Sequence, residues 1–174
     1  MKRIIFFTSI LLLALGSAAA ADSSLKLTKV HLCCPSCVKG IDKAVAGLPG
    51  VSAQCDKDAG TVTVTAPDQA TAQKAVDRIV DAGYFGASSD PAIKVSDKSG
   101  APKGKLTTLK ISGVHLCCGK CVTSVNEALS KVKGVKGNTA AKGADSFEVT
   151  GDFKAKPVFA ALNKAGFAGK AAAK

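Results

Sequence analysis

A nine-residue motif that occurs twice constrains this chain more than any other feature. It reads VHLCCPSCV at residues 30–38 and VHLCCGKCV at residues 114–122, and seven of the nine positions are identical. Each copy carries three cysteines, and the two copies hold the only two histidines of the chain. Because repeated sequence predicts repeated structure, we expect two similar folding units. The motif is compatible with a metal site, a redox-active dithiol or a structural disulfide.

The residues around the motif repeat as well, and they predict a strand followed by a helix. Apolar residues that lead into each motif and cover its first three positions alternate with one skipped step, which indicates a strand with an irregularity near its end. These residues are Leu25, Leu27, Val30 and Leu32 in the first copy, and Leu109, Ile111, Val114 and Leu116 in the second. After each motif, apolar residues recur every three to four positions and stop at Gly50 or Gly134, which predicts an amphipathic helix with a glycine stop.

The rest of each copy adds a hairpin, a second helix and a last short strand. A second strand opens at Val51 and at Val135. The further predicted elements are hairpin arms at 61–65 and 147–150, helices at 69–82 and 156–165, and last strands at 86–89 and 168–172. The resulting order is β-α-β-β-α-β. We therefore predict an α+β fold with two tandem ferredoxin-like domains, each an antiparallel sheet with two helices on one face.

The predicted domains cover residues 24–90 and 105–172. Residues 91–104 between them are rich in Ser, Gly, Pro and Lys, a composition typical of a flexible linker. Part of this region, AIKV at 92–95, also has strand character.

The first 20 residues have the three parts of a secretory signal peptide. Lys2 and Arg3 precede an apolar run, and small residues follow it, so we predict cleavage near Ala20 or Ala21. The apolar run is shorter than the roughly 20 residues that a membrane span needs. The prediction is a periplasmic or secreted protein that does not span the membrane.

The excess of positive over negative charge is confined to the second half of the predicted mature chain. Residues 22–95 hold eight Lys/Arg and eight Asp/Glu, whereas residues 96–174 hold fourteen Lys and five Asp/Glu. Such a surface can attract an acidic partner. Export removes the chain from most nucleic acids, and the lysines lack aromatic neighbours, so we expect a solvated surface and no nucleic-acid partner.

The position of the cysteines favours metal binding. Cys34 and Cys37, and likewise Cys118 and Cys121, form C-x-x-C pairs at a predicted helix start. The free N–H groups there favour the thiolate, which is the form that binds metals. Thiolates select soft or borderline ions such as Cu(I), Zn(II), Cd(II) and Hg(II).

With these residues the chain resembles the heavy-metal-associated domains of copper chaperones, metal-pumping ATPases and periplasmic mercury-binding proteins. The resemblance covers nearly the whole mature chain, twice over. It implies that Cys34 and Cys37 hold an ion in the first domain, and Cys118 and Cys121 in the second. It also implies that Tyr84 and Phe167 pack near the sites.

Both motifs depart from the Gly-Met-x-Cys-x-x-Cys loop of that family. Aligned on the C-x-x-C pairs, Leu32 or Leu116 replaces the Met; aligned on the strands, Gly113-Val114 replaces Gly-Met and the loop gains two residues. Either alignment leaves three cysteines and a histidine in each loop. These donors can close a tetrahedral Zn site or a three-coordinate thiolate site for a softer ion.

The extra donors therefore join the candidate metal ligands. Cys33 and Cys117 either ligate the ion or face the core as small apolar side chains. His31 and His115 are either ligands, partners of ligands, or surface histidines. Cys55 has no counterpart in the second copy, where Thr139 stands, and it is not included in the site.

The predicted function is that of a non-enzymatic, exported protein that binds a heavy-metal ion, with copper or zinc first among the candidates. It would sequester the ion or transfer it to a membrane metal transporter or another thiol-rich carrier. A thiol-disulfide oxidoreductase is the alternative from another class, although the aromatic residue expected before the first Cys of such a motif is absent. An adaptor with non-functional metal sites is the third reading.

Overall fold

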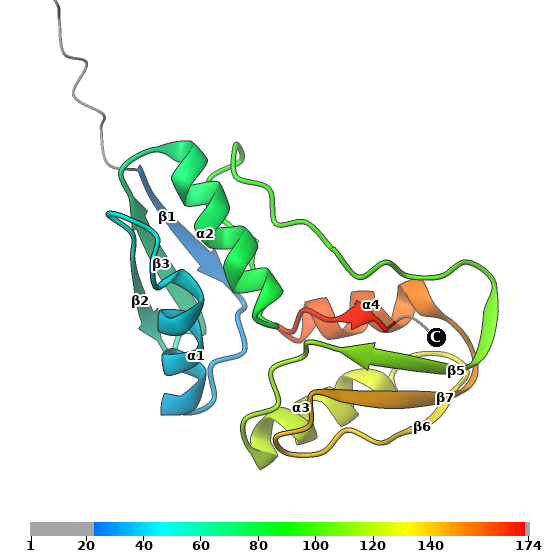
Figure 1. The fold of residues 1–174 in the computed structure, drawn as a ribbon. Coiled ribbons are helices and arrows are strands. Elements are labelled where there is room, and N and C mark those ends of the chain that lie inside the picture. The colour runs from blue at the N-terminus through cyan, green and yellow to red at the C-terminus, as the bar shows by residue number, and fades with distance from the viewer. Residues whose placement is uncertain (1–22, 173–174) are drawn as a thin grey trace, which may run out of the picture.

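The computed structural model describes residues 23–172, which form two units of one β-α-β-β-α-β design (Figure 1). The first unit contains β1 (Ser23–Thr28), α1 (Pro35–Val45), β2 (Ser52–Asp56), β3 (Thr61–Ala66), α2 (Gln69–Asp81) and β4 (Ala87–Ser88). The second contains β5 (Lys105–Ser112), α3 (Gly119–Ser130), β6 (Val135–Asn138), β7 (Ser146–Lys154), α4 (Ala155–Lys164) and β8 (Lys170–Ala171). The predicted signal peptide lies outside the described residues.

Each unit is built on an antiparallel sheet of four strands. The strand order is β2-β3-β1-β4 in the first sheet and β6-β7-β5-β8 in the second. Alternate side chains of β1 and β3 are buried, as period-2 strands with one covered face require. The two helices of each unit pack together on the covered face (Figure 1). The predicted α+β class with two ferredoxin-like units is confirmed.

Both first strands end at a residue with left-handed backbone. Lys29 has φ 61° and its counterpart Gly113 has φ 73°. This is the irregularity that the skipped step of the apolar pattern predicts. The chain leaves the sheet there, yet Val30 and Leu32 remain buried, so the apolar pattern continues past the strand into the cysteine loop.

The first helix of each unit ends earlier than the glycine stops predict. α1 ends at Val45 and α3 at Ser130, each followed by a short turn before Gly50 or Gly134. Leu48 and Val132 continue the apolar spacing from that turn, and their main-chain groups form turn hydrogen bonds. The predicted helices were too long, because a turn after a helix can also bury side chains at helical spacing.

The predicted linker contacts α2 and forms no strand at 92–95. Gln73 on α2 donates to the Lys94 carbonyl at 2.8 Å and accepts from the Lys94 N–H at 2.8 Å. Ile93 is buried, and the Ser99 carbonyl accepts from the N–H of Ala171 on β8 at 2.7 Å. The linker therefore packs against α2 and hydrogen-bonds to the last strand of the second unit, and it is not the flexible linker that its composition predicts.

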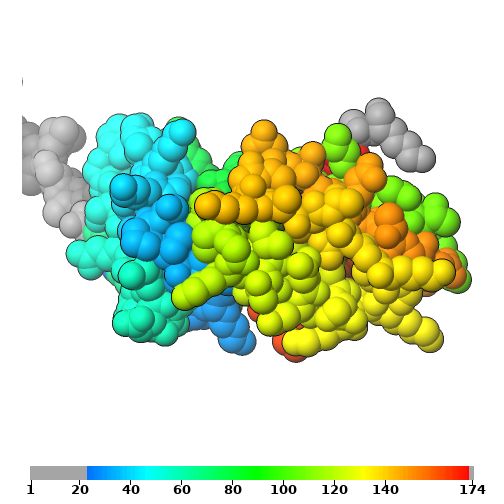
Figure 2. Space-filling view, turned by 90° about the horizontal axis from the view of Figure 1, so that it is seen from below, coloured from blue at the N-terminus to red at the C-terminus, as the bar shows by residue number. Residues whose placement is uncertain are grey.

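The two units contact each other directly, and the buried apolar residues of both form one cluster. Tyr84 and Phe167 form an antiparallel β-bridge between the units. On either side of it, the Phe85 N–H donates to the Gly166 carbonyl and the Ala168 N–H to the Gly83 carbonyl, each at 3.0 Å. The space-filling view shows the first unit, in blue and cyan, lying against the start of the second, in green (Figure 2). Among the described helices, none is both long and apolar enough to cross a membrane.

Candidate metal centre

The two cysteine loops reach the same place from opposite units. Cys34 caps α1 and Cys118 caps α3, both with extended backbone, and Pro35 follows at the first turn of α1. Proline suits that position because its missing N–H is not needed by the helix. Cys37 and Cys121 lie one turn into the helices and are fully buried. The helix starts therefore fix four sulfurs at the boundary between the units.

Six sulfurs form a single cluster across this boundary. Within a unit, Cys34 Sγ lies 3.8 Å from Cys37 Sγ, and Cys118 Sγ lies 3.8 Å from Cys121 Sγ. The contacts between units are shorter. They are Cys33 to Cys118 at 3.2 Å, Cys33 to Cys121 at 3.4 Å, Cys34 to Cys117 at 3.4 Å and Cys37 to Cys117 at 3.5 Å. The sequence predicts two separate loops; the structure places them against each other.

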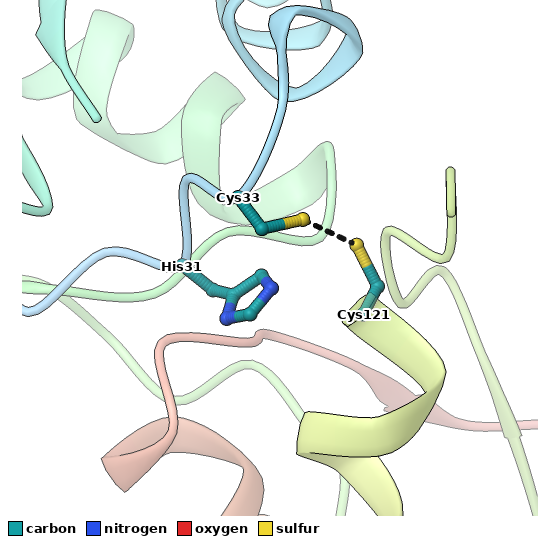
Figure 3. Close-up of side chains that lie close together, drawn as sticks. All are labelled: His31, Cys33 and Cys121. Atoms are coloured by element: carbon teal, nitrogen blue, oxygen red, sulfur yellow. Dashed lines mark hydrogen bonds between the residues drawn. The ribbon is translucent and has the colours of Figure 1, made fainter. Parts of the chain in front are cut away.

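Cys33 and Cys117 make these cross-unit contacts. Each is half-buried and each sulfur also lies 3.7 Å from a cysteine of its own unit, Cys37 or Cys121. Of the two alternatives, the geometry therefore places both thiols among the candidate ligands and not in the apolar core. Figure 3 shows Cys33 pointing from its loop toward Cys121 on α3.

The histidines pack on aromatic rings of the opposite unit. The His31 ring stacks on Phe167 with centroids 4.4 Å apart, and the His115 ring lies 4.6 Å from that of Tyr84. The Tyr84 hydroxyl in turn donates to the Cys37 carbonyl at 2.9 Å. The predicted position of Tyr84 and Phe167 near the cysteines therefore agrees with the structure, but each ring supports the histidine of the other unit.

Both histidines hold a nitrogen away from solvent without a protein partner. Among the described residues, the buried side-chain atoms that lack a hydrogen bond are His31 Nε2 and His115 Nε2. A buried polar atom costs free energy when it is unpaired, so an unpaired ring nitrogen beside thiols suits a metal ligand. His31 lies in a three-donor group with Cys33 and Cys121, as Figure 3 shows.

The thiols differ in their tendency to ionise. For Cys34, burial favours the neutral thiol, but the facing N–H groups of Cys37 and Ser36 and the neighbouring Cys117 outweigh it and lower the pKa to about 6. The N–H of Cys121 and the Cys33 side chain lower the pKa of Cys118. Burial raises the pKa of Cys33 and of Cys117, and the hydrogen bonds that their S–H groups donate to neighbouring cysteines raise it further. The helix-capping thiols therefore ionise first.

Three glycines make room for the contact between the units, and the sequence reasoning missed them. A Cβ on Gly83 would lie 2.5 Å from the Gly113 carbonyl oxygen, and a Cβ on Gly166 would collide with the N–H of His31. A Cβ on Gly40 would collide with the Tyr84 hydroxyl of the same unit and would lie 3.1 Å from His115 Cε1 of the other unit. The signal was present, because AGYFG and AGFAG carry two glycines and one aromatic at matching places, and Gly40 lies inside a predicted helix, where glycine is unfavourable.

Cys55 stands apart from the cluster, as predicted. It lies half-buried on β2, and burial raises the pKa of its thiol to about 11. All eight predicted site residues, in contrast, gather where the units meet. The described three-donor groups contain His31 and the six motif cysteines, while His115 belongs to none of them.

Two solved structures align with most of this chain. The N-terminal soluble domains of Bacillus subtilis CopA align with 18% identity and a TM-score of 0.32, covering 88% of this chain and 95% of that chain. The first two RRM domains of yeast poly(U)-binding protein Pub1 align with 10% identity and a TM-score of 0.23, covering 87% and 100%. Both superpositions are too loose to establish a shared arrangement.

The family comparison is more direct. Residues 27–85 match the family model described as the heavy-metal-associated domain. The match runs from the end of β1 to the aromatic after α2, and so includes the first cysteine loop and Tyr84. The resemblance inferred from the motif is confirmed for this part of the chain, which matches the heavy-metal-associated domain family.

Proposed function

We propose that this chain is an exported, non-enzymatic carrier that binds a soft heavy-metal ion on the thiolates of its two CCxxC loops. Copper and zinc are the first candidates for the ion. The observation that carries the proposal is the cluster of six thiols, with neighbouring sulfurs 3.2 to 3.8 Å apart, beside the unpaired Nε2 of His31. A structural disulfide needs two cysteines and no histidine, so it would not account for the third cysteine and the histidine of each loop.

The proposed role after capture is storage or transfer by ligand exchange. A partner with its own thiols, such as a membrane metal transporter or another thiol-rich carrier, would take the ion as its sulfurs replace those of the chain. A surface hollow beside the cluster, lined among others by Asp81, His115 and Cys117, supports the approach of such a thiol. We also propose that the second unit is a further heavy-metal-associated domain, because its motif, element order and sheet order repeat those of the first.

The decisive experiment is an anaerobic titration of the reduced mature chain with Cu(I), Zn(II), Cd(II) and Hg(II). Competing chelators set the affinity range, and the variant with Cys34, Cys37, Cys118 and Cys121 all replaced by Ser is the control. We expect binding of at least one of these ions by the native chain that the variant loses. Equal binding by both proteins would refute the proposed function.

A thiol-disulfide oxidoreductase is the second candidate, because the low pKa of Cys34 also suits an attacking thiolate. An insulin-reduction assay separates the two. A carrier has no such activity above that of the four-Ser variant, whereas activity lost in that variant would identify an enzyme.

Export is tested by expressing the full chain in a bacterial host and measuring the mass of the purified product. We expect a chain that begins after Ala20 or Ala21 and fractionates outside the cytoplasm. A full-length cytoplasmic product would contradict this part of the proposal.

A further inference from the structure

The candidate ligands of the two loops do not separate into one site per unit. The described residues form four three-donor groups in which all ligand atoms lie within 4.8 Å of one another. These groups are Cys33-Cys34-Cys118, Cys34-Cys37-Cys117, Cys117-Cys118-Cys121 and His31-Cys33-Cys121. Three of the four draw donors from both units, and the fourth shares one sulfur with each of the other three.

The groups share corners in a regular way. Five of the six sulfurs belong to two groups each, whereas Cys37 and His31 belong to one each. A thiolate has more than one lone pair, so a sulfur at a shared corner can bridge two ions. Cys33 and Cys117 make no contact with each other in the cluster, but each contacts three of the other four sulfurs. Each of the two therefore contacts cysteines at the helix starts of both units.

We propose that the two loops build one shared site that holds a thiolate-bridged cluster of about four Cu(I) ions, with His31 as the only nitrogen donor. This inference rests on the proposed function. A shared cluster differs from a pair of sites with one ion on each C-x-x-C pair. It requires both units, because each unit alone supplies only half of the sulfurs.

Coordination number and charge both favour Cu(I) over Zn(II). Each group offers three donors, whereas Zn(II) in structural sites almost always takes four. Four monovalent ions against six thiolates leave two negative charges, whereas four divalent ions would leave two positive charges on the cluster. On loading, the cysteines that are still protonated release their protons to solvent, and no electron is transferred, since copper enters and remains as Cu(I).

Native mass spectrometry under anaerobic conditions tests the proposal directly, with Cu(I) added stepwise to the reduced full chain. We expect the metal-free chain to convert cooperatively to a species with about four Cu(I), accompanied by the luminescence of a solvent-shielded Cu(I)-thiolate cluster. Stepwise filling to one ion per unit without that emission would overturn the shared site and leave the proposed function intact. Absence of thiol-dependent binding would overturn both.

A triple variant distinguishes shared from separate sites even if the stoichiometry is ambiguous. With Cys117, Cys118 and Cys121 replaced by Ser, no group would keep three donors. Two groups would keep two sulfurs each, Cys33 with Cys34 and Cys34 with Cys37. We expect the variant to lose more than half of the copper capacity and all of the emission. Retention of half the capacity with unchanged affinity would indicate independent sites.

The histidines provide a matched pair of variants. His31→Gln removes a donor from one group, whereas His115→Gln removes an equally half-buried imidazole that belongs to no group. We expect His31→Gln to lower the copper complement and His115→Gln to retain it. Equal complements in the two variants would contradict the assignment of His31.

Separation of the units by a single methyl group is the last arm of the test. An alanine at Gly166 would strike the His31 main chain, whereas an alanine at Gly104, with the same φ of 88°, meets nothing within 4 Å. We expect Gly166→Ala to lose cooperative loading and Gly104→Ala to keep it. If Gly166→Ala does not fold by circular dichroism, the triple and histidine variants decide.

Discussion

At the scale of single residues, the cysteine that precedes each C-x-x-C pair distinguishes these loops from a simple dithiol. Cys33 contributes the 3.2 Å contact with Cys118, the shortest sulfur contact in the cluster, and Cys117 contributes the equivalent contacts to Cys34 and Cys37. A helix start alone would position two sulfurs. The preceding residue adds a third, which lies close enough to reach the other unit.

Replacing both extra cysteines by Ser should weaken metal binding strongly. We expect Cys33→Ser with Cys117→Ser to lower the Cu(I) affinity by at least about tenfold, the smaller end of the loss that follows removal of a supporting group around a metal. Anaerobic competition with a chromophoric chelator measures the change. Cys55→Ser is the matched control, because this half-buried thiol lies outside the cluster and its loss should leave the affinity unchanged. Equal affinities of the two variants would contradict the role of the extra cysteines.

Tyr84 couples the cluster to the fold of the first unit. Its buried hydroxyl donates to the Cys37 carbonyl at 2.9 Å while its ring contacts His115. We expect Tyr84→Phe to lower the free energy of unfolding of the metal-free chain by about 1 kcal/mol, because the ring remains and one buried hydrogen bond is lost. Chemical denaturation under reducing conditions measures it. An unchanged free energy would mean that water replaces the hydroxyl.

At the scale of elements, α2 determines how the linker runs. The paired hydrogen bonds between Gln73 and the main chain of Lys94 hold the linker as a neighbouring strand would. We expect Gln73→Ala to release it and to raise the rate of tryptic cleavage at Lys94 and Lys98. Limited proteolysis followed by mass spectrometry gives that rate. Gln69→Ala, at the exposed start of the same helix, should leave the rate unchanged, and equal cleavage of the two variants would count against the proposed restraint.

The elements themselves were predictable because each has a local signature. Strand alternation in TVTVT and helical spacing after the cysteines specify β3 and α1 within the unit that contains them. The early end of α1 was not predictable, because Leu48 keeps the helical spacing from a turn. The linker contacts depend on one glutamine side chain, and no periodic pattern records such a contact.

The sequence was sufficient to predict which residues form the candidate site, but not that the two loops meet in one cluster. The cysteines and histidines are recognisable from chemistry and repetition. Their union into one cluster depends on packing between units, and an apolar pattern within one unit carries no information about that packing. The glycines and the aromatic repeated in AGYFG and AGFAG were the available signal. A side chain at Gly83 or Gly166 would collide with the main chain of the other unit.

At the scale of the whole molecule, an ion-pair network supplements the contact between the units. Asp81 at the end of α2 accepts a hydrogen bond from Lys170 on β8 at 2.9 Å, and Lys98 of the linker lies 3.5 Å from the same carboxylate. Lys98 also lies 3.3 Å from Asp77 on α2. The Asp81 carboxylate therefore joins the first unit, the linker and the second unit.

This network predicts how acid affects the docking of the units. The hydrogen bond from Lys170, with the charges of Lys170 and Lys98, holds the pKa of Asp81 below its ordinary value. A carboxyl group whose pKa is lower in the folded state stabilises that state above its unfolded pKa, near 3.9, and this contribution is lost as the pH falls through the lower folded value. Because Asp81 is nearly half exposed, solvent screening limits the contribution to below about 1 kcal/mol.

We therefore expect Asp81→Asn to loosen the contact between the units at neutral pH and to flatten the acid dependence of that contact below about pH 4. NMR relaxation measures it, because two docked units tumble together and two released units tumble separately. Asp152→Asn is the matched control: its 2.7 Å ion pair with Lys105 joins β7 to β5 within the second unit. If both variants tumble like the native chain at every pH, the Asp81 network does not hold the units together, and the β-bridge between Tyr84 and Phe167 with its flanking hydrogen bonds is sufficient.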